Sequence, residues 1–203
     1  GNSDFVYNGQ NDPDIALKAG QKYTFIRDSA GHPLRIVSAA DCAGKGCDAG
    51  KWTSLPTSSL TSVDSVQGTS NAVYTFKKAG TYYYLCTAHP DMVGKITVTW
   101  DACTMSTYGS VSLSSSCQIQ TSISLTGAMT INVASLRSSG EKLMLSMSDS
   151  MSPAINAGVY ALSINGFEIT DIKSDNKMVE STTGTIKLSG VDLKDNPRST
   201  GSG

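Results

Sequence analysis

Residues 82–100, "YYYLCTAHPDMVGKITVTW", place three metal-binding side-chain types within seven positions, namely Cys86, His89 and Met92. A thiolate, an imidazole and a thioether form a soft to borderline donor set, which favours copper. A His₂Cys site with a weak axial methionine needs a second imidazole, and the only other histidine of the chain is His32, in "SAGHPLRIV". The sequence therefore predicts one mononuclear copper site with the ligands His32, Cys86, His89 and Met92.

Each of these side chains also has an ordinary structural interpretation. A cysteine at the end of a strand is commonly a buried core thiol, and a methionine commonly fills space in a core. Zinc is the main alternative metal because it binds cysteine and imidazole, although its structural sites rarely use methionine. Copper is the interpretation that uses all four side chains together.

Short apolar segments rich in β-branched and aromatic residues predict an all-β protein. "QKYTFIRD", "PLRIVS", "AVYTF", "TYYYL" and "KITVTW" are bounded by Gly, Pro, Asp and Ser, a spacing typical of a sandwich or barrel. "AVYTF" and "TYYYL" are joined by a Lys-Lys-Ala-Gly turn, which predicts a hairpin. Cys86 ends one strand and Met92 precedes the next, so the loop between them curls around one point, and His32 must arrive from another strand end.

The segments "GHPLRIV" and "YYYLCTAHPDMVGKITV" resemble those of the cupredoxins, over about residues 4–100. The short loop "CTAHPDM" is similar to that of amicyanin, and "DPDIALKAGQKYTFI" resembles the opening strands of plastocyanin-like domains. The resemblance implies a Greek-key β-sandwich that carries single electrons at a type 1 copper held by the four predicted ligands. It also implies that electrons leave through His89, where a transient redox partner docks on an apolar patch of Pro33, Ala88 and Pro90.

Two positions depart from the family pattern beside the sulfur ligand. The residue after the first histidine ligand often donates its N–H to that sulfur, but Pro33 has no N–H. Proline is common two places after the cysteine, whereas Ala88 keeps its N–H. We therefore expect Ala88 to donate to the Cys86 sulfur and to tune the site.

The other four cysteines fall into two close pairs, Cys42 with Cys47 and Cys103 with Cys117. Both pairs suit local disulfides, which leaves Cys86 as the free thiol, although four cysteines allow three pairings and could also stay reduced. Disulfides together with high Ser, Thr and Gly predict an exported protein, either periplasmic, secreted or on the cell surface. A formal charge of −1 favours neither nucleic acid nor an anionic membrane, and no apolar run approaches the roughly 18 residues of a membrane span.

A change in composition after Trp100 predicts two domains, residues 1–100 and residues 101–203. In the second, "ISLTGAMTI", "LSINGFEIT" and "IKLSGVDLK" repeat a glycine between two strands, at Gly127, Gly166 and Gly190. The last interval suits one coil of a parallel β-helix, with a sandwich of similar hairpins as the alternative. We expect the start "GNSDF" to be a processed end and "STGSG" an added tail, and an exposed last coil would suit a piece of a longer protein.

The predicted function is a one-electron carrier or redox module. The alternative is an extracellular or cell-surface binding protein whose copper is a sensor, a store or a structural element, with a glycan or a protein bound by the second domain. An enzyme is not expected, because a second copper centre would need further histidines and no Ser-His-Asp set is available. We expect Met144, Met147 and Met151 to pack in a core rather than bind copper.

Overall fold

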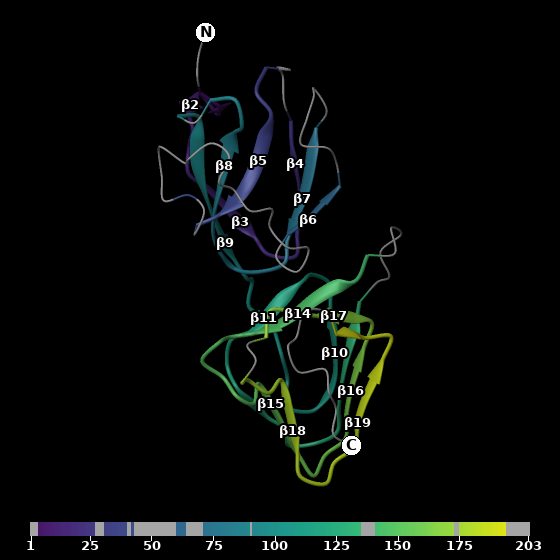
Figure 1. Cartoon of the computed structure of the whole chain (residues 1–203). Helices are drawn as coiled ribbons and strands as arrows, with labels where there is room; N and C mark the ends of the chain where they lie inside the picture. Colours follow the sequence, from purple (N-terminus) through teal and green to yellow (C-terminus); the bar gives the residue numbers. More distant parts are fainter. Residues whose placement is uncertain are drawn as a thin grey trace. The chain divides into compact units, whose positions relative to one another are not determined.

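The computed structural model describes residues 4–26, 31–39, 42, 60–63, 71–89, 91–134, 141–172 and 175–193. Every regular element within these ranges is a β-strand, which confirms the all-β prediction (Figure 1). The chain divides into two compact units, Gly1–Thr99 and Trp100–Gly203. Among the described residues, no helix has the length and apolar character needed to cross a membrane.

The first unit contains two sheets and a small hairpin. One sheet has the order β3 (Ile15–Lys18), β9 (Val93–Thr99), β8 (Gly80–Cys86) and β5 (Leu34–Ser38), in which β3 and β9 are parallel and the other pairs antiparallel. The other sheet is antiparallel, with the order β4 (Lys22–Phe25), β7 (Ala72–Phe76) and β6 (Leu60–Val63). The hairpin pairs β1 (Val6–Tyr7) with β2 (Gln10–Asn11).

Alternating burial along the strands explains how the two sheets pack. In β8, Tyr82 and Tyr84 are buried whereas Tyr83 is half-buried, as the two-residue period of a strand requires. The rings of Phe76 on β7 and Tyr82 on β8 lie 5.0 Å apart between centroids, so aromatic side chains join the two sheets. The first unit is therefore a β-sandwich.

The predicted hairpin between "AVYTF" and "TYYYL" is wrong. β7 pairs with β4 and β6, whereas β8 pairs with β5 and β9, so the Lys-Lys-Ala-Gly segment passes from one sheet to the other. Phe76 is fully buried, and its carbonyl accepts the N–H of Gly20 at 2.7 Å. Burial of this side chain between the sheets is better satisfied by a crossover than by a local hairpin.

The second unit consists of three parallel sheets. Their orders are β10 (Gly109–Leu113), β13 (Met129–Val133), β16 (Leu162–Asn165), β19 (Ile186–Ser189); β11 (Cys117–Ile119), β14 (Leu143–Met147), β17 (Phe167–Ile169), β20 (Asp192–Leu193); and β12 (Ile123–Ser124), β15 (Ile155–Gly158), β18 (Val179–Ser181). The chain visits the three sheets repeatedly and lays each new strand beside its predecessor. This stack of coils is β-helix-like, as predicted.

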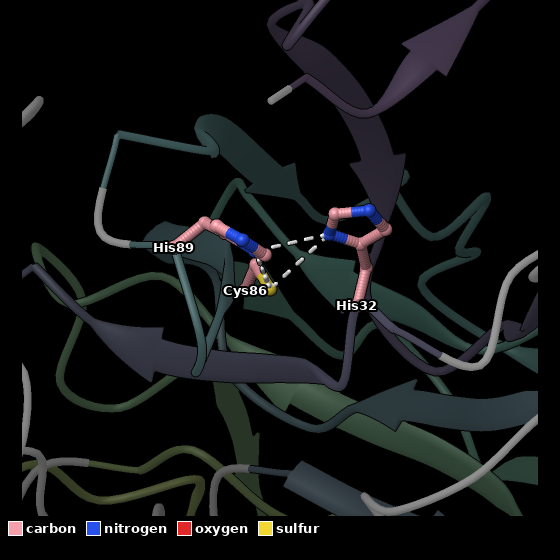
Figure 2. Close-up of side chains that lie close together, drawn as sticks. All are labelled: His32, Cys86 and His89. Carbon is pink, nitrogen blue, oxygen red and sulfur yellow. Dashed lines mark hydrogen bonds between the residues drawn. The ribbon is translucent and has the colours of Figure 1, made fainter. Parts of the chain in front are cut away.

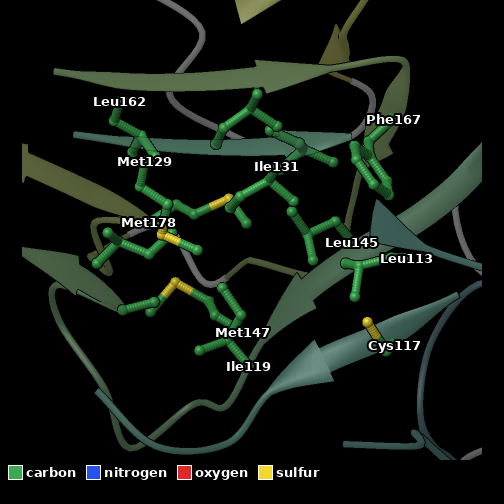
Figure 3. Packing of buried hydrophobic residues seen from close by; sticks show 14 of the residues in the cluster. Leu113, Cys117, Ile119, Met129, Ile131, Leu145, Met147, Leu162, Phe167 and Met178 are labelled. Atoms are coloured by element: carbon green, nitrogen blue, oxygen red, sulfur yellow. The ribbon is translucent and has the colours of Figure 1, made fainter. Parts of the chain in front are cut away.

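Apolar side chains from all three sheets fill the interior of the coils (Figure 3). Met147 and Met151 belong to this core, as predicted, whereas Met144 is buried but is not a member of this cluster. Leu145 and Phe167 are fully buried, so the strands of the second sheet present large side chains inward.

The register confirms one predicted repeat and corrects the other. Leu162 pairs with Ile186, 24 residues later, and Gly166 and Gly190 are equivalent, both with positive φ. Met129, however, pairs with Leu162, which places Gly127 level with Tyr160 rather than with Gly166. A longer connection in that coil shifts the repeat, so the shared Gly-strand pattern at Gly127 is coincidental.

Candidate metal centre

Three predicted ligands converge at one end of the sandwich (Figure 2). The Nδ1 atoms of His32 and His89 lie 3.1 Å apart. The Sγ atom of Cys86 lies 3.5 Å from Nδ1 of His89 and 3.8 Å from Nδ1 of His32. Cys86 is fully buried, His32 is half-buried and His89 reaches solvent, so the thiol is shielded while one imidazole remains accessible.

Backbone hydrogen bonds shape the loop that carries two of these ligands. The N–H of Cys86 donates to the carbonyl of Met92 at 3.0 Å, and the N–H of Met92 donates to the carbonyl of His89 at 3.1 Å. The N–H of His89 in turn donates to the carbonyl of Cys86 at 3.4 Å. These bonds close the loop on itself, so its side chains are held by the ends of β8 and β9.

His32 lies two residues before the neighbouring strand, β5. Leu34 and Cys86 are partners in the ladder between β5 and β8, which brings the residues just before Leu34 beside the cysteine. The carbonyl of Pro33 accepts the N–H of Thr87 at 3.0 Å and ties this segment to the loop. Pro33 thus contributes an acceptor at a position where it cannot donate.

The sulfur of Cys86 has two hydrogen-bonding neighbours among the described residues, the imidazoles of His32 and His89. An N–H···S bond from Ala88 is not among these contacts. The sequence-based expectation that Ala88 tunes the sulfur therefore finds no support in the geometry.

Met92 is the fourth predicted ligand. Its side chain is 1% exposed and lines the same cavity as His32, together with Leu34 and Tyr84. The thioether therefore lies in the apolar surroundings of the imidazole.

The three nearest donor atoms fit a metal ion. A triangle with their three separations has a circumradius of about 2.0 Å, close to the roughly 2.0–2.3 Å at which nitrogen and sulfur ligands hold a first-row metal such as zinc. Two imidazoles with a cysteine and a methionine are the donor set of type 1 copper sites. The convergence and the donor chemistry together define a blue-copper protein, which confirms the predicted cofactor.

The comparisons with known proteins give the family. Residues 2–99, just under half of the chain, match the copper binding proteins of the plastocyanin/azurin family, so this part of the chain is a copper-binding domain of that type. A solved structure of a reduced amicyanin mutant is similar at 26% identity, covering 46% of this chain and 77% of that chain, with a TM-score of 0.27. A comparison with curated proteins gives no match.

The cysteines outside the site are oxidised where the structure describes them. Cys103 and Cys117 form the predicted disulfide, with their Cα atoms 5.0 Å apart. Cys42 is disulfide-bonded, and its predicted partner Cys47 lies outside the described residues. Cys86 is a free cysteine, as a copper ligand must be. Disulfides and family membership are consistent with an extracytoplasmic protein.

The sequence did not lead us to expect one close contact beside the site, between Gly94 and Tyr84. A Cβ at Gly94, in β9, would overlap the ring of Tyr84, so only glycine lets this ring lie over the strand. The hydroxyl of Tyr84 donates to the carbonyl of Pro13 at 2.7 Å, and burial together with the nearby carboxylates raises its pKa. A glycine inside a strand pattern is a known signal of such close approach.

Proposed function

We propose that the first unit is a one-electron carrier or redox module in which His32, Cys86, His89 and Met92 would hold a copper ion. The main support is that Nδ1 of His32, Nδ1 of His89 and Sγ of Cys86 all lie within 3.8 Å of one another. Bound copper supplies a one-electron Cu(II)/Cu(I) couple. The protein holds the donors on paired strand ends, so that their positions change little when the charge of the site changes.

We propose His89 as the point where electrons enter and leave. Its imidazole reaches solvent, whereas the thiol of Cys86 is fully buried. Ala88 is exposed beside it, and Pro33 is half-buried. Pro90, the third member of the predicted patch, lies outside the described residues. A small apolar patch of this kind suits a transient redox partner, because weak electron-transfer encounters use small interfaces.

Three broader assignments belong to this proposal. Residues 1–100 form the copper domain and residues 101–203 a β-helix-like domain. The chain is exported to the periplasm, the outside or the cell surface, which agrees with its disulfides. The protein is not an enzyme, since both histidines of the chain lie at the copper site.

A visible spectrum of the Cu(II)-loaded chain tests the site. We expect an intense thiolate-to-copper band that is lost in Cys86→Ser. The double variant Cys103→Ser/Cys117→Ser is the matched control, because it makes the same replacement away from the site and should keep the band. A colourless wild-type protein that binds zinc more tightly than copper would contradict the proposal.

A further inference from the structure

The first unit contains a cavity that is lined by residues of the N-terminal hairpin and of both sheets. Its volume is about 560 Å³, within the range of pockets that hold small organic molecules. Val6 and Ile26 line it and are 57% and 74% exposed, so one side of the cavity reaches solvent. Met92 lines it and is 1% exposed, so the other side lies inside the domain.

Aromatic rings form much of the wall, and they are contributed by Phe5, Tyr7, Tyr23, Phe25 and Tyr84. The hydroxyl of Tyr84 donates to the carbonyl of Pro13 at 2.7 Å. The hydroxyl of Tyr23 accepts the N–H of Lys18 at 2.7 Å and donates to the side chain of Gln21 at 3.3 Å. Both hydroxyls are thus already bonded within the protein, and these two side chains offer a ligand their rings rather than free polar groups.

The charge of the wall is negative. Asp4 is the one acidic residue among the described residues of the lining, and these include no lysine or arginine. The side-chain amide of Asn11 donates to Oδ2 of Asp4 at 2.9 Å, and because this amide is neutral it positions the carboxylate without cancelling its charge. Burial first, and then the carboxylate of Asp12, raises the pKa of Tyr84, so a negative field extends to that ring as well.

We propose that this cavity binds an organic cation with an apolar body, such as a quaternary or aromatic amine. Aromatic faces attract a cation through their quadrupole, and a neighbouring carboxylate adds Coulomb attraction. An anion would be repelled by Asp4, and a sugar would find two of the tyrosine hydroxyls already bonded. The cation is the class of ligand whose charge and surface both complement the lining.

The cation site lies beside the metal centre but does not depend on it. His32 and Met92 line the cavity, so a bound molecule lies against two of the four predicted copper ligands. The carboxylate of Asp4 and the five rings belong to other residues, so binding requires neither the metal nor the atoms that would hold it. The proposal therefore does not rest on the assignment of copper.

Titration of the full 203-residue chain with benzyltrimethylammonium, followed by NMR of ¹³C-labelled methionine methyl groups, tests the proposal. The Met92 methyl signal should shift saturably, with a dissociation constant on the order of 0.1–1 mM for a probe of this size. The methyl signals of Met147 and Met151, which lie in the core of the second unit, should not move. The same result is expected with and without Cu(I), which separates a failure of this proposal from a failure of the copper assignment.

The charge and the rings are tested separately. Asp4→Asn should weaken binding of the cation about fivefold. Tyr7→Leu, which removes a ring that is 60% exposed, should weaken it by about twofold to fivefold. Asp175→Asn and Tyr108→Leu make the same replacements at exposed positions of the second unit, and both should leave binding unchanged. An unchanged circular dichroism spectrum of each variant shows that a loss of binding arises at the site and not from unfolding.

Phenylmethanesulfonate carries the same ring with a negative tetrahedral head group, and it should bind at least about tenfold more weakly than the cation. Equal binding of the two probes, or equal affinity of Asp4→Asn and Asp175→Asn for the cation, overturns the proposed class of ligand. Absence of a saturable Met92 shift at cation concentrations well above the expected range overturns the site itself.

Discussion

Gly94→Ala should destabilise the copper domain through one buried ring. A methyl group at this position overlaps Cζ and Oη of Tyr84, whose side chain is 3% exposed and cannot swing away without cost. The ring is held by its hydrogen bond to the carbonyl of Pro13 and by an edge contact with Phe5, with centroids 5.7 Å apart. The substitution must therefore displace Tyr84 or bend β9.

The size of the effect follows from these contacts. Loss of the hydrogen bond to Pro13 costs about 1 kcal/mol, and loss of the aromatic edge contact costs about 0.5–1.5 kcal/mol. Overpacking a filled site adds about 1–3 kcal/mol when the ring stays partly in place. A displaced ring loses both contacts, whereas a ring that stays in place overpacks the site, so these costs do not simply add. We therefore expect Gly94→Ala to lower the free energy of unfolding by about 3 kcal/mol.

Urea unfolding of the copper-loaded chain, followed by the loss of the blue band, measures this cost in the first unit alone. Tyr84→Ala provides the second corner of a double-mutant cycle, because it removes the ring that the new methyl group meets. In that background Gly94→Ala should be neutral or slightly stabilising, since alanine reduces the entropy of the unfolded chain. An equal cost in both backgrounds would refute the assignment of the strain to Tyr84.

Two further predictions use the same approach. The pKa of Tyr84 is raised above its ordinary value of 10.0 by burial first and then by Asp12 and Asp14, so its contribution is present below about pH 10 and is lost as the pH rises further. Tyr84→Phe should lower the free energy of unfolding by about 1 kcal/mol at pH 7 but should reduce the loss of stability at high pH. Urea midpoints that fall equally in wild type and Tyr84→Phe from pH 7 to pH 11 would contradict this. Removing the disulfide in Cys103→Ser/Cys117→Ser, whose cysteines are 14 residues apart, should cost the second unit about 3 kcal/mol in thermal unfolding. An unchanged midpoint for that unit would show that the crosslink contributes little.

The metal site could be predicted from the sequence because its chemistry is local and scarce. Cys86, His89 and Met92 lie within one loop, and only one further histidine was available. The prediction required only that His32 lie near Cys86. The pairing of β5 with β8 brings these two residues together.

Features that depend on pairing between distant strands were less predictable. The Lys-Lys-Ala-Gly segment has the composition of a hairpin turn, but burial of Phe76 between the sheets makes it a crossover. The glycine pattern identified the coil that ends at Gly190, yet it misplaced Gly127 because the connections in earlier coils differ in length. The close contact of Gly94 with Tyr84 depends on a ring from the neighbouring strand, so the sequence could signal it only weakly.

The strands that hold the donors also explain why Gly94 matters for function. The N–H of Cys86 donates to the carbonyl of Met92, and β9 begins at the next residue, so any bend of β9 near Gly94 is transmitted directly to the loop. Tyr84 lines the same cavity as His32 and Met92, and its displacement would change the packing of both side chains. Because a carrier of single electrons needs donors that keep their places in both charge states, Gly94→Ala should alter the blue band itself as well as the stability of the domain that bears it.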